Sequence, residues 1–475
     1  MKKTLLILMT SLFALTSCSS SSSVEIGTGQ SQIMIEDPAT GSDNSNKKKA
    51  DIILTYAATT NMSSAEKNLI SEFNMADNGF KINVKTYEDN VKYIGDSEDG
   101  EMRIASQDSI NARNIEIMND IISGEIDIIS DCSFGTDLFE NLMGKGAFVD
   151  LYSFMEKDDE INSSTLNTHV LELHETDGKL YMMPYLFKID TLCGKTEYVG
   201  TKENQTLDEF IANWESMPEG SMICGHDTKS YVYMNVLRNQ MFSFVDYANA
   251  EVSFDSPEFI KLLEFCNTFY NDDGDYHERA WNAVNMVERA QISGFDSFHL
   301  YIRKDDVTFV GYPSEDGKGS YIDSTGYRLA INSAVSKERQ KGAWEFLRMA
   351  AGEEYQLSIW NITDEKSLMQ GEMGFPVNLN AYNEAAKRTM NGEYYPDVRS
   401  FSGVEENVGQ ITEDELKRCT DYINNVQAIT TVIDRDILFD VIESEIYAYF
   451  DGAQSAETAA EMLQNRLSIY VSESQ

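Results

Sequence analysis

The sequence predicts an α/β protein made of two α/β halves and a helical tail. The first half alternates between apolar strand patterns and helical spacing, in the order expected for a parallel sheet with right-handed crossovers. The predicted elements are a strand at 52–56, a helix capped by Ser63 or Ser64, a strand at 80–87, a helix at 108–123 and a strand at 126–129. An acidic loop follows the second strand, and Gly124 ends the second helix.

The same kind of pattern returns in the second half, and helices dominate after residue 337. Ser256 is a candidate N-cap there, because serine favours helix starts. The predicted strands cover 180–192, 307–310 and 327–331, and the predicted helices cover 230–244 and 257–271. The tail helices cover 337–351, 353–360, 378–391, 412–427, 434–450 and 455–473.

Length and composition bound the class of protein. The chain has 475 residues, of which 42% are hydrophobic, so it is long enough for two or three domains and too apolar to be disordered overall. A formal net charge of −41 argues against nucleic-acid binding, because so acidic a surface repels phosphate. It fits an exported protein that stays soluble. Five histidines leave little material for a histidine-based metal or acid–base site.

The amino terminus has the plan of an export signal. Basic residues at Lys2 and Lys3 precede an apolar run that is too short to span a bilayer. The segment Leu15–Cys18 resembles the bacterial lipobox, which implies cleavage after residue 17 and a lipid on Cys18. Residues 18–50 are rich in Ser, Gly, Asp, Asn and Lys and are predicted to be a flexible tether. Two or more acyl chains anchor a protein stably, so attachment to the membrane is expected through this lipid only.

Five further cysteines are present, and their state is left open. They are Cys132, Cys193, Cys224, Cys266 and Cys419. No close cluster occurs, which argues against zinc, and an odd number cannot all pair. Buried free thiols are the main expectation, and a Cys193–Cys224 disulfide is the alternative.

Several segments in order resemble bacterial extracellular solute-binding proteins of the sugar type, the maltose-binding-like family 1. The matching segments are 115–129, 142–151, 177–184, 206–210, 311–314, 341–347 and 449–470, and together they extend over nearly all of 51–475. The resemblance implies a two-lobed periplasmic-binding-protein-like fold with hinge strands and a helical C-terminal tail. It assigns 51–187 plus 318–373 to lobe one and 188–317 plus 374–475 to lobe two.

The resemblance also implies a function without catalysis or cofactor. A monomeric, lipid-anchored protein on the extracellular face of the cell membrane would close around a mono- or oligosaccharide by hinge bending. It would then deliver this sugar to the permease subunits of an ABC transporter. Neither a metal nor a nucleic acid is expected.

Candidate ligand-binding residues follow from the chemistry of sugars, which offer hydroxyls and flat apolar faces. They lie after predicted strands or in segments that resemble ligand-contacting ones, and they are Thr59, Asn61, Asp131, Phe134, Tyr185, Tyr231, Tyr233, Phe295, Phe298 and Phe375. Asp131 is the leading polar candidate, with a helix or turn cap as its alternative role. Phe295 and Phe298 stand in a loop where the family usually carries tryptophan. For each aromatic residue a place in the core is the alternative.

Other functions remain open alternatives. One alternative keeps the fold and changes the ligand to a polyamine, a peptide or an anion, and another makes the protein a sensor. An exported glycan-active hydrolase belongs to a different class, since two carboxylates among the 79 acidic residues would suffice for it. The common motifs of hydrolases, zinc proteases and nucleotide-binding proteins do not occur in the sequence.

Overall fold

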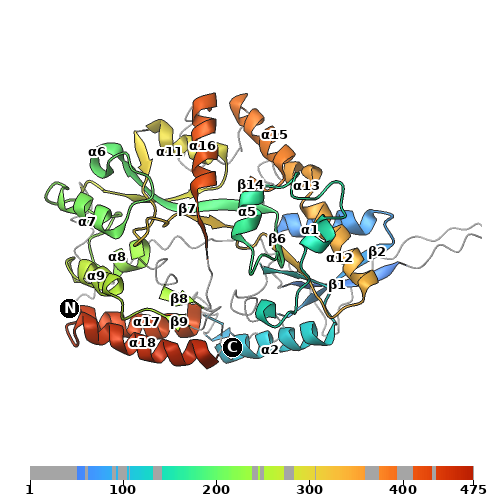
Figure 1. Ribbon diagram of the computed structural model, residues 1–475, viewed down its shortest axis with the longest axis horizontal. Coiled ribbons are helices and arrows are strands. Elements are labelled where there is room, and N and C mark those ends of the chain that lie inside the picture. The colour runs from blue at the N-terminus through green and yellow to red at the C-terminus, as the bar shows by residue number, and fades with distance from the viewer. Residues whose placement is uncertain are drawn as a thin grey trace, which may run out of the picture. The chain divides into compact units, whose positions relative to one another are not determined.

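Figure 1 shows the computed structural model of the chain. It describes residues 51–58, 62–87, 93–94, 104–105, 107–131, 142–237, 244–246, 251–271, 283–304, 306–358, 374–392, 410–430 and 435–473. These residues belong to one compact unit, Ala50–Gln475. Their strands form two main sheets and two short antiparallel pairs. The short pairs are β3 (Tyr93–Ile94) with β4 (Ile104–Ala105), and β8 (Val245–Asp246) with β9 (Glu251–Val252).

The first sheet has the strand order β2-β1-β5-β13-β6. Its strands are β1 (Ile52–Ala58), β2 (Phe80–Thr86), β5 (Ile128–Ser130), β6 (Met182–Pro184) and β13 (Arg328–Ile331). Strand β1 is parallel to both β2 and β5, which confirms the predicted parallel arrangement for these three strands. Strand β13 is antiparallel to β5 and β6, so the sheet as a whole is mixed.

The second sheet is built around β7 (Leu186–Lys195), which is buried along nearly its whole length. Its other strands are β10 (Glu288–Ile292), β11 (Val307–Phe309), β12 (Tyr321–Asp323), β14 (Phe375–Pro376) and β15 (Ala428–Ile429). Strands β10, β11, β12 and β14 are all antiparallel to β7, and β15 is parallel to β12. A strand with partners on both edges and covered faces needs an apolar sequence, which β7 has.

Two short segments among the described residues join strands of the two sheets directly. Tyr185 alone separates β6 from β7, and residues 324–327 join β12 to β13. The backbone N–H of Tyr185 donates to the carbonyl oxygen of Tyr327 at 3.0 Å, so the two segments lie side by side. The predicted lobe boundaries stay a prediction. Strand β12, which they assign to lobe one, pairs within the second sheet.

Helices cover both sheets. Those around the first sheet are α1 (Ser64–Met75), α2 (Gln107–Ser123), α4 (Tyr152–Met155), α5 (Thr168–Leu173), α12 (Lys337–Ala350) and α13 (Glu353–Ser358). Around the second sheet lie α6 (Thr196–Val199), α7 (Leu207–Glu215), α8 (Lys229–Val232), the π-helix η3 (Tyr233–Leu237), α9 (Pro257–Cys266) and α11 (Phe295–Lys304). The caps predicted from sequence are present: Ser63 forms a capping box with Glu66, and Ser256 caps α9.

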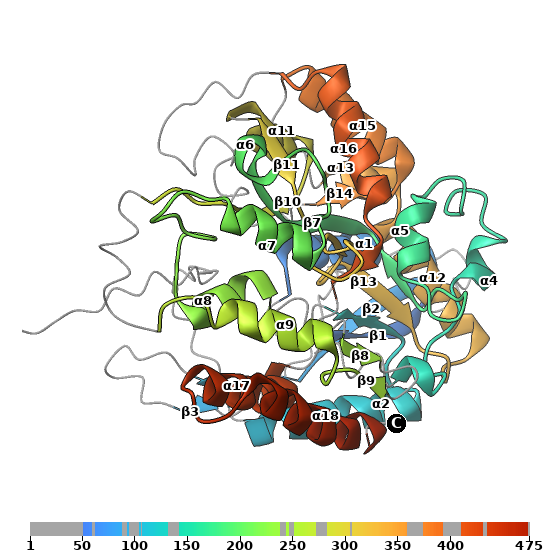
Figure 2. The ribbon, with the colours of Figure 1, turned by 60° about the vertical axis from the view of Figure 1, so that its left-hand side comes forward.

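The predicted helical tail is confirmed. It begins with α12 and α13 and continues with α15 (Leu379–Met390), α16 (Glu413–Asn425), α17 (Arg435–Phe450) and α18 (Ala456–Glu473). Helix α15 packs against α13 and α11, while α18 packs against α17 and α9. Figure 2 shows α17 and α18 side by side along α9. Among the described residues, no helix combines the length and apolar character that a membrane span requires.

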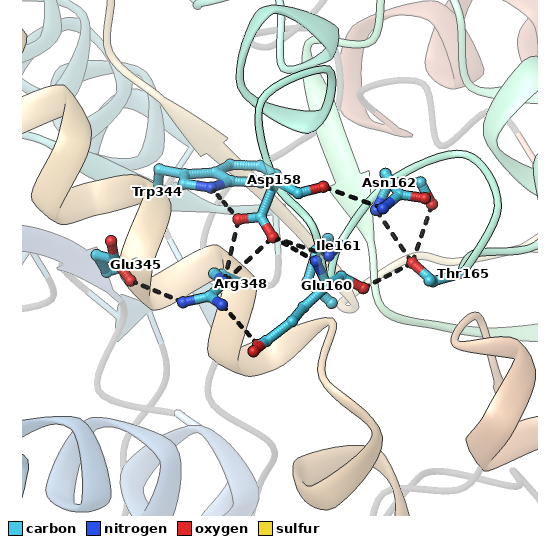
Figure 3. Close-up of polar contacts among 8 residues, drawn as sticks. All are labelled: Asp158, Glu160, Ile161, Asn162, Thr165, Trp344, Glu345 and Arg348. Carbon is cyan, nitrogen blue, oxygen red and sulfur yellow. Dashed lines mark hydrogen bonds and ion pairs between the residues drawn. The ribbon is translucent and has the colours of Figure 1, made fainter.

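A polar network fixes the turn after α4 to helix α12 (Figure 3). The carboxylate of Asp158 accepts hydrogen bonds from the backbone N–H groups of Glu160 and Ile161, both at 2.9 Å. It also accepts the indole N–H of Trp344 at 2.9 Å and pairs with Arg348 at 3.0 Å. These charge-assisted bonds lower the pKa of Asp158 against the opposing effect of its burial.

Three buried hydroxyls join the second sheet to α16. The side-chain oxygens of Thr191, Ser320 and Tyr422 lie 2.7 to 3.0 Å from one another, and all three residues are at most 1% exposed. Each hydroxyl both donates and accepts, so the three can satisfy one another away from water. This hydroxyl triangle holds α16 against β7 and β12.

The four described cysteines are free thiols. They are Cys193, Cys224, Cys266 and Cys419. The alternative of a Cys193–Cys224 disulfide is therefore wrong. Cys193 of β7 lies opposite Glu288 of β10. Ile223, the residue before Cys224, accepts a backbone hydrogen bond from Val287, which directly precedes β10, so its segment lies on the other side of that chain. Strands two apart are separated by about 10 Å, beyond the reach of a disulfide. Cys18 and Cys132 lie outside the described residues.

Candidate functional site

The ends of several strands meet where the chain passes between the sheets. In the first sheet β1, β2 and β5 run parallel, so their carboxyl ends share one edge. Strand β6 ends and β13 begins at this same edge, because Pro184 pairs in register with Arg328. In the second sheet β12 ends beside the start of β7, with Asp323 opposite Lys188. Ligands of open α/β sheets bind beyond the carboxyl ends of strands, so this is the candidate site.

We call this region the crossing site. It consists of Asp131, Tyr185, Lys188, Asp323, Ser324, Thr325, Tyr327, Arg328 and Thr430. Asp131 follows β5, and Thr430 follows β15, whose parallel pairing with β12 brings it to Ile322: the backbone N–H of Thr430 donates to that carbonyl at 2.8 Å. The site therefore joins segments from four distant parts of the sequence.

An ion pair between Asp131 and Arg328 is the centre of the crossing site. The guanidinium Nε of Arg328 lies 2.6 Å from Asp131 Oδ2, and the backbone N–H of Arg328 donates to Oδ1 at 3.0 Å. Both side chains are buried, at 1% and 9% exposure. Burial raises the pKa of Asp131, and the adjacent guanidinium limits the rise by favouring the carboxylate.

A second Asp–Arg pair, in which the aspartate is buried and the arginine half-buried, lies at the opposite end of β5. Asp127 precedes the strand, and Arg339 of α12 donates to its Oδ1 from Nε at 2.6 Å and to its Oδ2 from Nη2. This carboxylate also accepts the backbone N–H of Thr55 at 2.6 Å. Arg339 thus uses the two-nitrogen fork that makes arginine a strong carboxylate partner. Arg328 offers Asp131 only Nε and its backbone N–H, which leaves Nη2 unused by the pair.

Four polar atoms of the crossing site are buried without a hydrogen-bond partner in the part of the chain that the structure describes. They are Nη2 of Arg328, Oγ of Ser324, Oγ1 of Thr325 and Oγ1 of Thr430. Buried polar groups are nearly always paired, and each unpaired one costs about 1–3 kcal/mol. Four such atoms on neighbouring segments make the crossing site a candidate position for a polar ligand.

Two tyrosines and a lysine complete the crossing site. The rings of Tyr185 and Tyr327 meet edge to face with centroids 5.8 Å apart, and the Lys188 ammonium lies 5.4 Å from the centre of the Tyr327 ring. Tyr185 is buried, whereas Tyr327 is half-buried. Tyr327 is therefore the aromatic side chain of this site that retains exposed surface.

His174 lies near the site and is neutral. Its Nδ1 carries the proton, because it donates to the carbonyl oxygen of Val170 at 2.7 Å. Burial lowers the pKa of His174 to about 3, and the positive charge of Arg328 acts in the same direction. The imidazole adds no charge to the site at neutral pH.

The structure brings only some of the predicted ligand-binding residues together. Asp131 and Tyr185 lie at the crossing site, while Thr59, Asn61 and Phe134 lie outside the described residues. Tyr231 is on α8, where it stacks on His226 with ring centroids 4.2 Å apart, and Tyr233 is buried against Phe450. No ligand is present to test these roles, so they stay predictions.

The other three predicted phenylalanines, Phe295, Phe298 and Phe375, are fully buried. Phe295 and Phe375 meet edge to face at 5.1 Å, and Phe298 stacks on Phe309 at 5.3 Å. These contacts are those of core residues, the alternative that the sequence left open. A ligand role for them stays a prediction.

Sequence reasoning missed Ser324, Thr325, Arg328 and Thr430. One signal was available for Arg328, which is the only charged residue in the run Tyr327–Ile331. A charge in such a run needs a buried partner. Thr430 gives no such signal, because its position depends on pairing between β12 and β15. No group of three or more metal-binding side chains occurs among the described residues.

Comparisons with solved structures identify the fold. The sugar-binding protein MalE of Xanthomonas citri aligns over 89% of this chain and 98% of its own, with 10% identity and a TM-score of 0.52. A periplasmic oligogalacturonide-binding protein of Yersinia enterocolitica aligns over 89% and 100%, with 13% identity and a TM-score of 0.50. A family 1 extracellular solute-binding protein of Bifidobacterium longum subsp. infantis aligns over 88% and 99%, with 15% identity and a TM-score of 0.50.

The chain therefore has the two-lobed α/β fold of solute-binding proteins, as the sequence predicted. At such low sequence identity, the structural similarity establishes the fold of this chain and not its ligand. No family model and no curated protein matches the sequence.

Proposed function

We propose that the chain is a sugar-type solute-binding protein that binds a carbohydrate at the crossing site and releases it unchanged. The observation that carries the proposal is a set of four buried polar atoms at the junction of the two sheets, none of which has a hydrogen-bond partner among the described residues. A sugar hydroxyl both donates and accepts, so one ligand can satisfy the guanidinium donor and the three hydroxyls together. The half-buried ring of Tyr327 offers an apolar surface to a sugar face.

The fold supports the same proposal. The similar proteins from Xanthomonas citri and Yersinia enterocolitica are described as sugar-binding and oligogalacturonide-binding. A two-lobed protein binds by bringing both halves onto its ligand, which suits a site whose atoms come from both sheets. Membership of the sugar-type solute-binding family, with no catalytic activity, belongs to this proposal.

The cellular role is part of the proposal as well. Cleavage after residue 17 would leave Cys18 lipidated, so that the protein stays at the extracellular face of the membrane as a monomer and delivers its ligand to an ABC permease. Incorporation of labelled palmitate, and its loss in Cys18→Ala, tests the anchor. Size-exclusion chromatography with light scattering tests the monomer.

Thermal unfolding with a panel of mono- and oligosaccharides tests the binding function. A ligand at one hundred times its Kd stabilises the native state by about 2.7 kcal/mol, which a thermal melt detects easily. Chromatography of the recovered ligand should show it intact. A melting temperature that no sugar raises, or a sugar recovered as fragments, would contradict the proposal.

A further inference from the structure

We infer that Arg328 is a ligand-binding residue of the crossing site and that it selects an uncharged oxygen acceptor, so that the solute is a neutral sugar rather than a uronic acid or a polyamine. The inference rests on the proposed function and refines it. It depends on how the guanidinium of Arg328 is shared between Asp131 and the ligand.

The first step is the comparison of the two Asp–Arg pairs of β5. Arg339 gives both Nε and Nη2 to Asp127, so its fork is occupied by protein. Arg328 gives Nε to Asp131, while its Nη2 is buried with no partner among the described residues. The residue is only 8% exposed, so water does not readily solvate that donor. A bound ligand oxygen is the partner that fits, because an N–H donor requires an acceptor.

The second step concerns charge. The Asp131 carboxylate neutralises Arg328 at 2.6 Å, and Asp323 lies opposite Lys188 in the register of β12 and β7. Each base of the crossing site therefore has an acid beside it, and His174 is neutral. A carboxylate on the ligand would therefore meet no positive charge that is not already neutralised by an acid. The free-energy cost of removing the carboxylate from water would not be offset by a new ion pair. An ammonium group would meet the donor Nη2 instead of an acceptor.

The third step concerns geometry. Ser324 and Thr325 belong to a turn in which the backbone N–H of Tyr327 donates to the carbonyl oxygen of Ser324 at 2.8 Å. Their hydroxyls and that of Thr430 can each donate to or accept from a ligand hydroxyl. One fixed donor beside three hydroxyls matches a polyhydroxylated, neutral molecule.

Matched sugar pairs test the selectivity. Calorimetry or thermal unfolding would compare each neutral sugar with its uronate. The pairs are glucose and glucuronate, galactose and galacturonate, and galactotriose and trigalacturonate, and spermidine is the cationic probe. We expect binding by a neutral member of a pair, at least tenfold weaker binding of its acidic partner, and none of spermidine. Equal or tighter binding of a uronate or of spermidine would overturn the inference while leaving solute binding intact. If none of these compounds binds, the proposed function fails together with the inference.

The role of Arg328 is tested with Arg328→Lys, which keeps the positive charge for Asp131 and removes the planar fork. The affinity for the neutral sugar should fall roughly tenfold or more, because a hydrogen bond from a charged donor is lost. Thr430→Val removes the hydroxyl that follows strand β15 and should also weaken binding of the neutral sugar. Arg339→Lys is the matched control: it weakens the equivalent pair at the far end of β5 and should leave affinity unchanged. Unchanged affinity in Arg328→Lys, or an equal loss in Arg339→Lys, would overturn the role assigned to Arg328.

Discussion

The carboxylate of Asp131 and the guanidinium of Arg328 lie 2.6 Å apart, and both are shielded from solvent. This contact ties the end of β5 to the start of β13, which is the strand that returns from the second sheet. It therefore fixes one of the segments through which the chain passes between the sheets.

Replacing Asp131 with Asn should destabilise the protein by about 3–5 kcal/mol, because it leaves the buried guanidinium without a counter-ion. Chemical denaturation measures the loss. Asp421→Asn is the control, since Asp421 pairs with Lys417 on the exposed face of α16 and such pairs contribute at most about 1 kcal/mol. Similar losses in the two variants would show that the Asp131 pair is not desolvated as described.

The neutral state of His174 predicts an acid-dependent loss of stability. The unfolded chain binds a proton at this residue below its ordinary pKa of 6.5, whereas the folded protein does so only near a pKa of about 3. Below pH 6.5 the unfolded state gains a proton at His174 that the folded state does not bind. The free energy of unfolding therefore falls as the pH is lowered from 6.5 towards the folded-state pKa of about 3. Melting temperatures between pH 8 and pH 4 measure this loss.

His174→Asn keeps a side-chain N–H for the carbonyl of Val170 and does not titrate. The variant should lose less stability than the parent protein between pH 6.5 and pH 4, and parallel curves would contradict the assignment.

The network in Figure 3 predicts unequal roles for two neighbouring acids. Asp158→Ala removes the acceptor of the Trp344 indole N–H and of two backbone N–H groups, at a cost of about 1–3 kcal/mol. Glu160→Ala removes a 75% exposed carboxylate from the same Arg348 and should change the stability by less than about 0.5 kcal/mol. Denaturation of both variants checks the contrast, and an equal effect would argue that the network depends on charge alone.

The free thiols predict insensitivity to reductant. Cys193 and Cys224 flank β10 and cannot bond to each other without moving a strand. Peptide mapping under non-reducing conditions should find no disulfide that joins them. Cys266 and Cys419 are buried, which raises the pKa of each thiol, and both should react with alkylating agents only after unfolding.

Local signals in the sequence predicted most of the fold. Ser63 and Ser256 mark helix starts because their side chains bond the first free N–H groups, and this requires no distant partner. The same holds for Gly124, whose φ of +75° ends α2. Strand β13 was predicted as a strand, but its antiparallel direction was not, since direction depends on where the chain crosses from the second sheet.

The candidate site was predicted less well, for a physical reason. Asp131 was found because it directly follows a strand. Its partner Arg328 is 197 residues away, and pairing at that distance leaves no local pattern. Aromatic residues were ambiguous for another reason: the side chains that stack on sugars also fill cores. Phe295 and Phe298 are fully buried, as core residues are, and a ligand role for them stays a prediction.

The hydroxyl triangle of Thr191, Ser320 and Tyr422 bears on how the sequence can change over evolution. Loss of one member removes a hydrogen-bond partner from each of the other two in a dry environment, so a replacement at one position alone is disfavoured. In diverging lineages these three positions should vary together, with apolar residues arriving at all of them or at none.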